Sequence, residues 1–233
     1  MLNNDLLSSG FVGEDIPSQE SMFSNISEFY RSESGYSCLH LCRRYGKLHI
    51  LKSLQPPFRQ EEFYKQLLHK EFNIGYQLDH PNIRHTIDWE QQEDLGLCIV
   101  MEYVDGISLK EFMIQGKLTQ PLAYKFIREL CEALHYIHSK QLVHKDLKPE
   151  NIIITHNGNN VKLIDFGLSD RDDYDTLKIP AGTKKYLAPE QLLPHASPDC
   201  RTDIYSLGVI IQDITSVIKD RRLVRIAQKC TQK

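Results

Sequence analysis

Residues 142–151 read Leu-Val-His-Lys-Asp-Leu-Lys-Pro-Glu-Asn, and residues 164–167 read Ile-Asp-Phe-Gly. Two apolar, β-rich runs lie between these segments, and the five polar residues that separate the runs include an Asn-Gly pair. Asn-Gly favours the positive φ values of a tight hairpin turn. A hairpin at this place would carry Asn151 and Asp165 to the same end of two paired strands.

The pattern brings together two carboxylates and an amide, from Asp146, Asp165 and Asn151. These groups suit magnesium-assisted phosphoryl transfer, in which one Asp accepts or orients the proton of an attacking hydroxyl and the other two residues hold Mg²⁺. A lone Asp-Phe-Gly would be a weak signal. Here its Asp stands 14 residues after an Asn that closes an Asp-x-x-x-x-Asn pattern, and together they are specific.

The two segments resemble the catalytic loop and the metal-binding motif of the eukaryotic-type protein kinases. The resemblance implies that Asp146 is the catalytic base, that Lys148 stabilises charge, and that Asn151 and Asp165 bind Mg²⁺. A lysine two residues after the base resembles the Ser/Thr-directed kinases more than the Tyr-directed ones. The resemblance therefore implies ATP and Mg²⁺ as cofactors and a protein substrate with a Ser or Thr acceptor.

Two earlier segments extend the resemblance towards nucleotide binding. Lys52 ends His-Ile-Leu-Lys, where kinases have Val-Ala-Ile-Lys, and that lysine contacts the α- and β-phosphates of ATP and pairs with a helix glutamate, here Glu71. Residues 100–106 resemble the hinge between kinase lobes, which implies that the Glu102 carbonyl and the Val104 amide hold the adenine edge. Taken alone, Lys52 or Glu71 would more commonly be a charged group on the solvated surface.

The phosphate-covering loop departs from the family pattern Gly-x-Gly-x-x-Gly-x-Val. Residues 32–39 read Ser-Glu-Ser-Gly-Tyr-Ser-Cys-Leu, with serine at every expected glycine; Ser34, Gly35 and Leu39 are its candidate nucleotide contacts. Glycine allows close backbone approach at no steric cost, so three serines are expected to hold the loop away from the phosphates or restrict its closure. Ile50, in place of a small roof residue, is expected to narrow the adenine pocket.

Three further positions complete the comparison with the family. Residues 182–190 resemble the peptide-docking segment that ends in Ala-Pro-Glu, and Asp203 resembles the helix Asp that anchors the catalytic loop, which separates protein kinases from small-molecule kinases. Glu190 is expected to lack the arginine that it usually pairs with. Gly75 replaces an apolar residue, so a gap is expected beside Phe166.

The order of elements predicts an α+β, bilobal protein kinase-like fold. The expected amino-terminal lobe is a small antiparallel sheet with one regulatory helix at about residues 28–103, and the expected carboxy-terminal lobe is mainly helical at about 104–233. Helical patterns cover residues 58–78, 109–115, 121–140 and 206–217, and further strands are expected near 83–89 and 95–103. Residues 1–27 are expected to form a flexible or loosely docked extension.

Composition narrows the functional classes. The chain has 233 residues, a formal net charge of -3 and 25% charged residues, which is a balance without the basic excess of a nucleic-acid-binding protein. It has no apolar run of the ~20 residues that span a bilayer. We therefore expect a cytoplasmic protein with no nucleic-acid partner and no membrane insertion, and the family leaves room for a regulatory partner protein.

Two other hypotheses remain beside an active protein kinase. A pseudokinase-like binding module would use the same fold to present a surface, and the serine-filled loop favours it, whereas retention of Lys52, Asp146 and Asp165 opposes it. A small-molecule kinase shares the nucleotide chemistry but lacks the docking segment.

Overall fold

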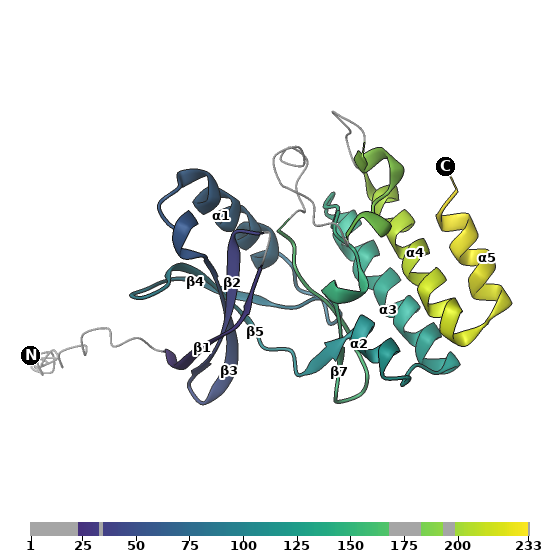
Figure 1. The fold of residues 1–233 in the computed structure, drawn as a ribbon, viewed down its shortest axis with the longest axis horizontal. Coiled ribbons are helices and arrows are strands. Elements are labelled where there is room, and N and C mark those ends of the chain that lie inside the picture. The colour runs from purple at the N-terminus through teal and green to yellow at the C-terminus, as the bar shows by residue number, and fades with distance from the viewer. Residues whose placement is uncertain (1–22, 33–34, 168–182, 193–198, 233) are drawn as a thin grey trace, which may run out of the picture.

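The computed structural model of this chain describes residues 23–32, 35–167, 183–192 and 199–232. These residues form two lobes, with a β-sheet and one long helix in the first and mostly helices in the second (Figure 1). Within this described part, no helix has both the length and the apolar character to cross a bilayer.

The first lobe is built on a five-stranded antiparallel sheet. Its strands, in spatial order, are β1 (Phe23–Arg31), β2 (Ser37–Arg44), β3 (Lys47–Leu54), β5 (Gly96–Glu102) and β4 (Thr86–Gln92). Strands β2 and β3 join through Tyr45 and Gly46, whose φ values of 50° and 77° belong to a tight hairpin turn. Strand β2 buries every second residue, as expected for a strand with one face against a core.

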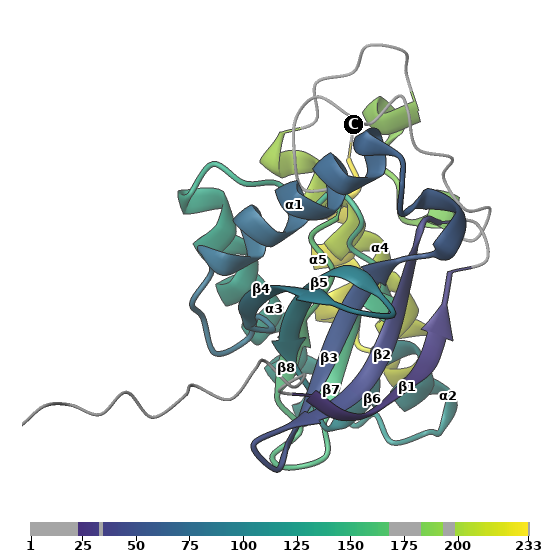
Figure 2. The ribbon, with the colours of Figure 1, turned by 90° about the vertical axis from the view of Figure 1, so that its left-hand side faces the viewer.

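Helix α1 (Glu62–Tyr76) lies against this sheet (Figure 2) and follows a short 3₁₀ turn, η1 (Pro56–Phe58). Leu68 of the helix is fully buried in a cluster with residues of β3 and β5. Residues three or four positions apart share one face of a helix, so Glu71 points into the sheet with Leu68. The packing of α1 thus fixes the direction of its one buried carboxylate.

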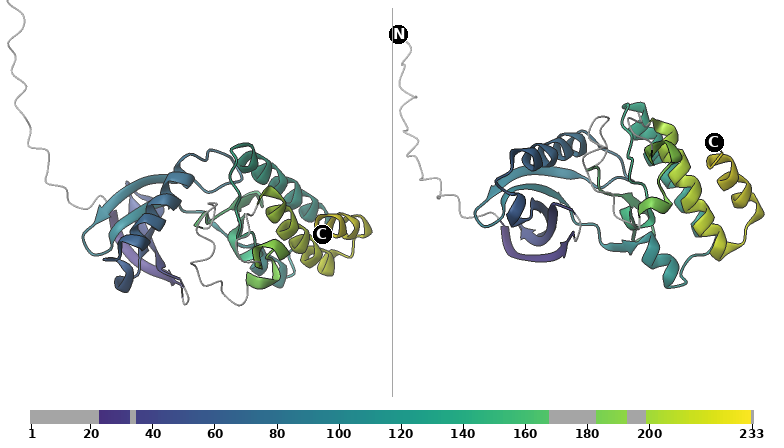
Figure 3. Two further views of the ribbon diagram at one scale, coloured as in Figure 1. Left: turned by 90° about the horizontal axis from the view of Figure 1, so that it is seen from above. Right: turned by 45° about the horizontal axis from the view of Figure 1, so that its top comes forward.

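The second lobe contains four helices and a small sheet. The helices are α2 (Leu109–Ile114), α3 (Gln120–Ser139), α4 (Cys200–Ile218) and α5 (Arg221–Cys230), and the sheet has strands β6 (Gly106–Ser108), β7 (Ile152–Thr155) and β8 (Val161–Leu163). Its core includes Phe126 and Leu130 of α3 and Ile210 of α4. Both views in Figure 3 show α5 alongside α4 on the outer side of this lobe.

The α+β bilobal fold predicted from the sequence is confirmed, but several boundaries were wrong; for example, the helix predicted for 206–217 begins at Cys200, and the strand predicted for 83–89 begins at Thr86. Strand β1 begins at Phe23, so the end of the predicted 1–27 extension is part of the sheet; residues 1–22 lie outside the described residues. The helix predicted for 58–78 begins at Glu62, because the Pro-Pro pair before it forms the turn η1. The hairpin between the two motifs is confirmed as β7 and β8.

Candidate active site

Asp146 lies in the loop that joins α3 to the 3₁₀ turn η2 (Pro149–Asn151). Its Oδ2 accepts hydrogen bonds from Lys148 Nζ at 2.6 Å and from Asn151 Nδ2 at 2.9 Å. Its Oδ1 is buried and has no hydrogen-bond partner among the described residues. A buried acceptor without a donor is costly, so Oδ1 is the atom at which an incoming hydroxyl would be stabilised.

The environment of Asp146 changes its acidity. Its side chain is only 11% exposed, and this burial raises the pKa of Asp146, while the charge of Lys148 opposes the rise. A carboxylate with a raised pKa accepts a proton more readily than an ordinary aspartate. These properties suit Asp146 to receive or orient a proton, and its catalytic role remains a prediction.

The backbone around Asp146 is anchored by Asp203 of helix α4. Asp203 is fully buried, and its carboxylate accepts hydrogen bonds from the amides of His144 at 2.8 Å and Lys145 at 2.9 Å, and from His138 Nε2 at 2.8 Å. The structure thus bears out the anchoring role predicted for Asp203. Hydrogen bonds to a buried charge are among the stronger ones, so this loop is held rigidly.

His144 supports the metal-binding motif from below. Its ring lies 5.1 Å from the ring of Phe166 at an interplanar angle of 63°, and its Nε2 is 3.2 Å from the carbonyl of Ile164. His144 is fully buried. These contacts give His144 a structural role, because they hold its ring against the segment that carries Asp165.

Lys52 of strand β3 contacts Glu71, its predicted partner, and also Asp165, for which no contact with Lys52 was predicted. Its Nζ is 2.6 Å from Glu71 Oε1 and 3.2 Å from Asp165 Oδ1. Lys52 is 6% exposed and Glu71 is 5% exposed, so the pair is shielded from water. Burial disfavours the charge on Lys52, but the two carboxylates outweigh burial and raise its pKa, which keeps the ammonium charged.

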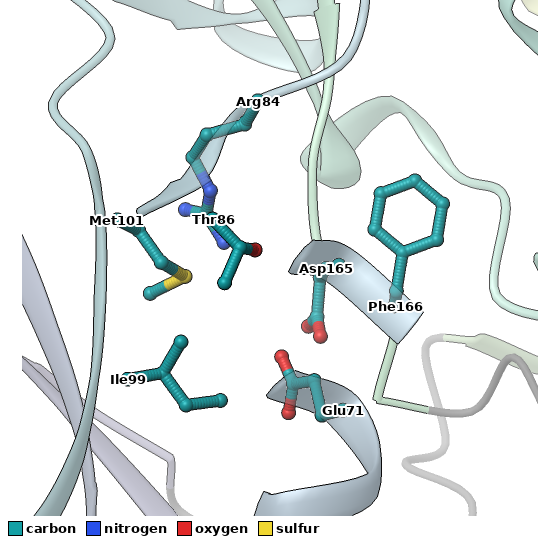
Figure 4. Close-up of a pocket in the computed structure, with 8 residues that line it drawn as sticks. Glu71, Arg84, Thr86, Ile99, Met101, Asp165 and Phe166 are labelled. Carbon is teal, nitrogen blue, oxygen red and sulfur yellow. The ribbon is translucent and has the colours of Figure 1, made fainter. Parts of the chain in front are cut away.

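A second cation, Arg84, lines a pocket that also contains Asp165. Figure 4 shows Arg84, Thr86, Met101 and Glu71 around a pocket that reaches Asp165. Burial by itself would raise the pKa of Asp165, but the charges of Lys52 and Arg84 outweigh it and hold that pKa well below its usual range. Asp165 therefore stays ionised between two cations. Its backbone φ of 67° lies in the left-handed region, which is unusual for a residue other than glycine.

The residues at the end of the hairpin fit a divalent metal. The Ile164 amide donates to the Asn151 carbonyl at 3.0 Å, which places Asn151 beside Asp165 at the end of β7 and β8. The side-chain nitrogen of Asn151 donates hydrogen bonds to Asp146. The side-chain oxygen of Asn151 is therefore the atom that is available to bind a metal. The Asp165 side chain is 41% exposed despite its contact with Lys52. Carboxylate and amide oxygens are the ligands that Mg²⁺ prefers.

The predicted adenine contacts lie between the lobes. Strand β5 ends at Glu102 and β6 begins at Gly106, so Val104 is in the connection between them. The Glu102 side chain is used structurally, since its Oε2 accepts from Lys162 Nζ at 3.0 Å and from the His85 amide at 3.1 Å. The adenine contacts predicted for Glu102 and Val104 involve only their backbones and remain a prediction.

Two apolar residues predicted to enclose the nucleotide belong to the core of the first lobe. Ile50 is 4% exposed, and Leu39 packs against the same cluster, which also contains Met101. Met101 is thus both the residue before the hinge and a wall of the pocket in Figure 4. Ser34, another predicted nucleotide contact, lies outside the described residues, and Gly35 lies in the turn between β1 and β2.

Two departures from the family pattern are partly compensated. The gap expected beside Phe166 is present, since Gly75 and Phe166 line the same pocket, and Thr86 limits it, because a Cβ atom at Gly75 would come within 2.3 Å of Thr86 Oγ1. The usual arginine partner of Glu190 was expected to be missing, and another segment supplies a contact, since Glu190 Oε1 accepts from the Thr202 hydroxyl at 3.2 Å.

The segment that resembles the peptide-docking region is tied to helix α4. Tyr186 donates from its hydroxyl to Asp213 Oδ2 at 2.8 Å, and Ser206 donates to the Tyr186 carbonyl at 2.7 Å. Gln191 reaches back to the catalytic loop, where its Nε2 donates to the Lys145 carbonyl at 3.0 Å. The docking segment and the catalytic loop are therefore parts of one hydrogen-bonded unit.

Sequence reasoning did not find Arg84, Gln191 or Gln55, which contacts the phosphate loop. Each is polar and stands outside the motifs, and nothing in its neighbouring residues marks it. Only a surplus of carboxylates over cations around Lys52 could have pointed to a second cation such as Arg84.

The comparisons with known proteins agree with this geometry. The family model described as "Protein kinase domain" matches residues 33–221, and the chain therefore belongs to the protein kinase domain family. A probable serine/threonine-protein kinase of Clostridium perfringens is 32% identical over 182 residues, which are 76% of this chain and 26% of that protein. The serine/threonine-protein kinase PrkC of Bacillus subtilis is 32% identical over 70% of this chain and 26% of its own length.

Similarity extends to a eukaryotic relative. The serine/threonine-protein kinase ppk25 of Schizosaccharomyces pombe is 40% identical over 146 residues, which are 61% of this chain and 34% of that protein. This chain thus spans only about a quarter to a third of the length of these relatives.

Proposed function

We propose that this protein is an ATP- and Mg²⁺-dependent serine/threonine protein kinase. One observation carries the proposal. Lys52 and Glu71 form an ion pair that is shielded from water and also contacts Asp165, and Asp146 presents a buried oxygen that has no hydrogen-bond partner in the described part of the chain. A binding module needs neither the charge balance nor the orphaned acceptor, whereas phosphoryl transfer uses both.

In this mechanism the acceptor hydroxyl donates its hydrogen bond to Asp146 Oδ1. As the hydroxyl oxygen forms its bond to the γ-phosphorus, the bond from that phosphorus to the bridging oxygen of ADP breaks, and the proton passes to Asp146. Its raised pKa favours this transfer. Lys148, 2.6 Å from Asp146 Oδ2, holds the carboxylate in place and balances negative charge that gathers on the moving phosphoryl group.

The other residues bind and orient the nucleotide. Lys52 would hold the α- and β-phosphates while Glu71 fixes the direction of its ammonium. Asn151 and Asp165 would hold Mg²⁺, which supplies neutralisation of the phosphate oxygens when bound. Catalysis would come chiefly from positioning and electrostatic stabilisation by these residues.

Two features support a protein hydroxyl as the acceptor. Lys148 stands two residues after Asp146, as in the Ser/Thr-directed members of the family, and the docking segment is hydrogen-bonded to the catalytic loop through Gln191. The bacterial and yeast relatives carry serine/threonine-protein kinase names. The substrate protein itself would be found by its phosphorylated residues in a lysate.

The experiment compares the parent with Asp146→Asn and Asp165→Asn in a phosphorylation assay with labelled ATP and Mg²⁺. Both substitutions keep side-chain size, and Asp220→Asn serves as a matched control, because Asp220 caps the start of α5 and asparagine can also accept the capping hydrogen bonds. We expect transfer to Ser or Thr in the parent and in the control, and a loss of at least about a hundredfold in the two site variants. Equal background labelling in all four proteins would contradict the proposal and favour the pseudokinase-like module.

A further inference from the structure

Gln55 binds the loop between β1 and β2 with its side chain. It follows strand β3 directly, and its Nε2 donates to the carbonyl oxygens of Ser32 at 2.7 Å, Gly35 at 3.0 Å and Ser37 at 3.3 Å. The backbone amide of Gln55 also donates to the Tyr36 carbonyl at 2.8 Å. An amide group carries two N–H bonds, so three carbonyls share them and converge on one nitrogen.

The loop is also closed by its own atoms. The Ser32 amide donates to the Ser37 carbonyl at 3.2 Å, and the Gly35 amide donates to Ser32 Oγ at 2.9 Å. A Cβ atom on Gly35 would lie 2.5 Å from Ser32 Oγ, so the glycine makes room for the serine hydroxyl. The serine at the first glycine position of the family pattern therefore has a structural role. Replacing its side chain would remove that role.

Tyr36 joins this loop to helix α1. Its ring centroid lies 5.3 Å from that of Tyr64 in α1, and Tyr64 lies 4.6 Å from Phe58 in η1. Burial, followed by the negative charge of Glu71, raises the pKa of the Tyr36 hydroxyl, which therefore stays neutral. The loop is thus packed against the helix that carries Glu71, the partner of Lys52.

We propose that Gln55 is a positioning residue that holds Ser32, Gly35 and Ser37, the described ends of the loop between β1 and β2, in place for binding of the nucleotide phosphates, and that Tyr36 couples these residues to α1. The inference rests on the proposed kinase function. A glycine-rich loop can change its shape to fit a ligand, because the backbone of glycine is conformationally permissive. Here a side-chain amide prepares the loop in advance, so phosphate binding depends on Gln55, while adenosine binding at the hinge does not.

The test separates the phosphates from the nucleoside. Calorimetry would give the dissociation constants of Mg²⁺-ADP and of adenosine for the parent, for Gln55→Met, which keeps chain length but removes both donors, and for Gln60→Met, an exposed control in the same segment. Three lost hydrogen bonds predict about tenfold weaker ADP binding in Gln55→Met. Adenosine binding is expected to stay within about twofold, and Gln60→Met is expected to match the parent.

A purely structural role for Gln55 gives a different result. Equal weakening of ADP and adenosine, or no weakening of either in a folded variant, would overturn the inference. If the parent bound neither ADP nor ATP, the proposed kinase function would fail and the inference with it. Steady-state kinetics adds an independent readout, since Gln55→Met should raise the KM for ATP and leave kcat within about twofold.

The coupling through Tyr36 has its own measurement. Tyr36→Phe keeps the ring contact with Tyr64, whereas Tyr36→Ala removes it. Amide hydrogen exchange in α1 should be faster in Tyr36→Ala than in Tyr36→Phe, and only the alanine variant should raise the KM for ATP. Identical exchange in both variants would show that the loop and the helix are independent and would overturn this part of the inference.

Discussion

The catalytic loop and the phosphate loop between β1 and β2 are held in different ways. Asp203, 58 residues beyond Lys145, anchors the catalytic loop through buried, charge-assisted hydrogen bonds, and Gln191 adds another from the docking segment. The phosphate loop depends on the neutral and partly exposed side chain of Gln55. Anchors from several distant segments resist local change, whereas a single anchor can be altered without unfolding the protein.

This difference explains where the family pattern is kept and where it is lost. The catalytic loop has the family motif, and several of its residues have partners within a buried network. The phosphate loop has serines at the three glycine positions of the family pattern, and Gln55 and the Ser32 hydroxyl contact its described residues. We therefore expect substitutions in the first region to reduce stability and those in the second to alter ligand affinity alone.

The largest effect is expected from Asp203→Ala. The change removes a buried acceptor of three hydrogen bonds and leaves two backbone amides unpaired, so the free energy of unfolding should fall by about 3 kcal/mol or more. Asp213→Ala in the same helix is the control, because its side chain is 23% exposed and should cost about 1 kcal/mol. Urea denaturation measures both, and equal small losses would contradict the contrast between the regions.

A smaller effect is expected at Arg84. Arg84→Met keeps most of the packing but removes one of the two cations that hold Asp165 ionised, so kcat/KM for ATP should fall about tenfold. Arg84→Lys retains the charge and should recover most of the activity. If the methionine and lysine variants lose activity equally, the shape of Arg84 matters and its charge does not.

The smallest effect concerns the acid limb of the pH profile. Asp146 must be ionised to accept a proton, and burial raises its pKa, so activity should fall with decreasing pH earlier than for an ordinary aspartate. Lys148 opposes the rise, so Lys148→Met should move the acid limb of kcat/KM to higher pH as well as lowering the rate. An acid limb that stays in place in Lys148→Met would show that another group controls it.

The sequence predicts those parts of the site that are coded by short, fixed spacings. Asp146 and Asn151 lie on one loop, and the Asn-Gly turn of the hairpin returns the chain to Asp165, so their meeting follows from local structure. Lys52 and Glu71 meet because a strand and the following helix pack together. Such contacts can be predicted without knowledge of the whole fold.

The parts that escaped prediction depend on contacts between distant segments. Gln55 stands before two prolines and looks like an ordinary loop residue, and its role appears only when the turn between β1 and β2 folds over it. Arg84 has no motif around it, and its position follows from a backbone hydrogen bond to Leu163 of β8. Thr86 beside Gly75 is a third case, since a small residue in one segment was matched by a polar residue in another.

The proposed binding of a metal-bound nucleotide by Lys52, Asn151 and Asp165 is tested most directly by measuring ATP affinity as a function of Mg²⁺ concentration. In the parent, affinity should rise with Mg²⁺ and reach a plateau, because the metal would link the phosphates to Asn151 and Asp165. In Asp165→Asn the rise should largely disappear, while adenosine still binds. An ATP affinity that is independent of Mg²⁺ in the parent, or unchanged by Asp165→Asn, would contradict the account.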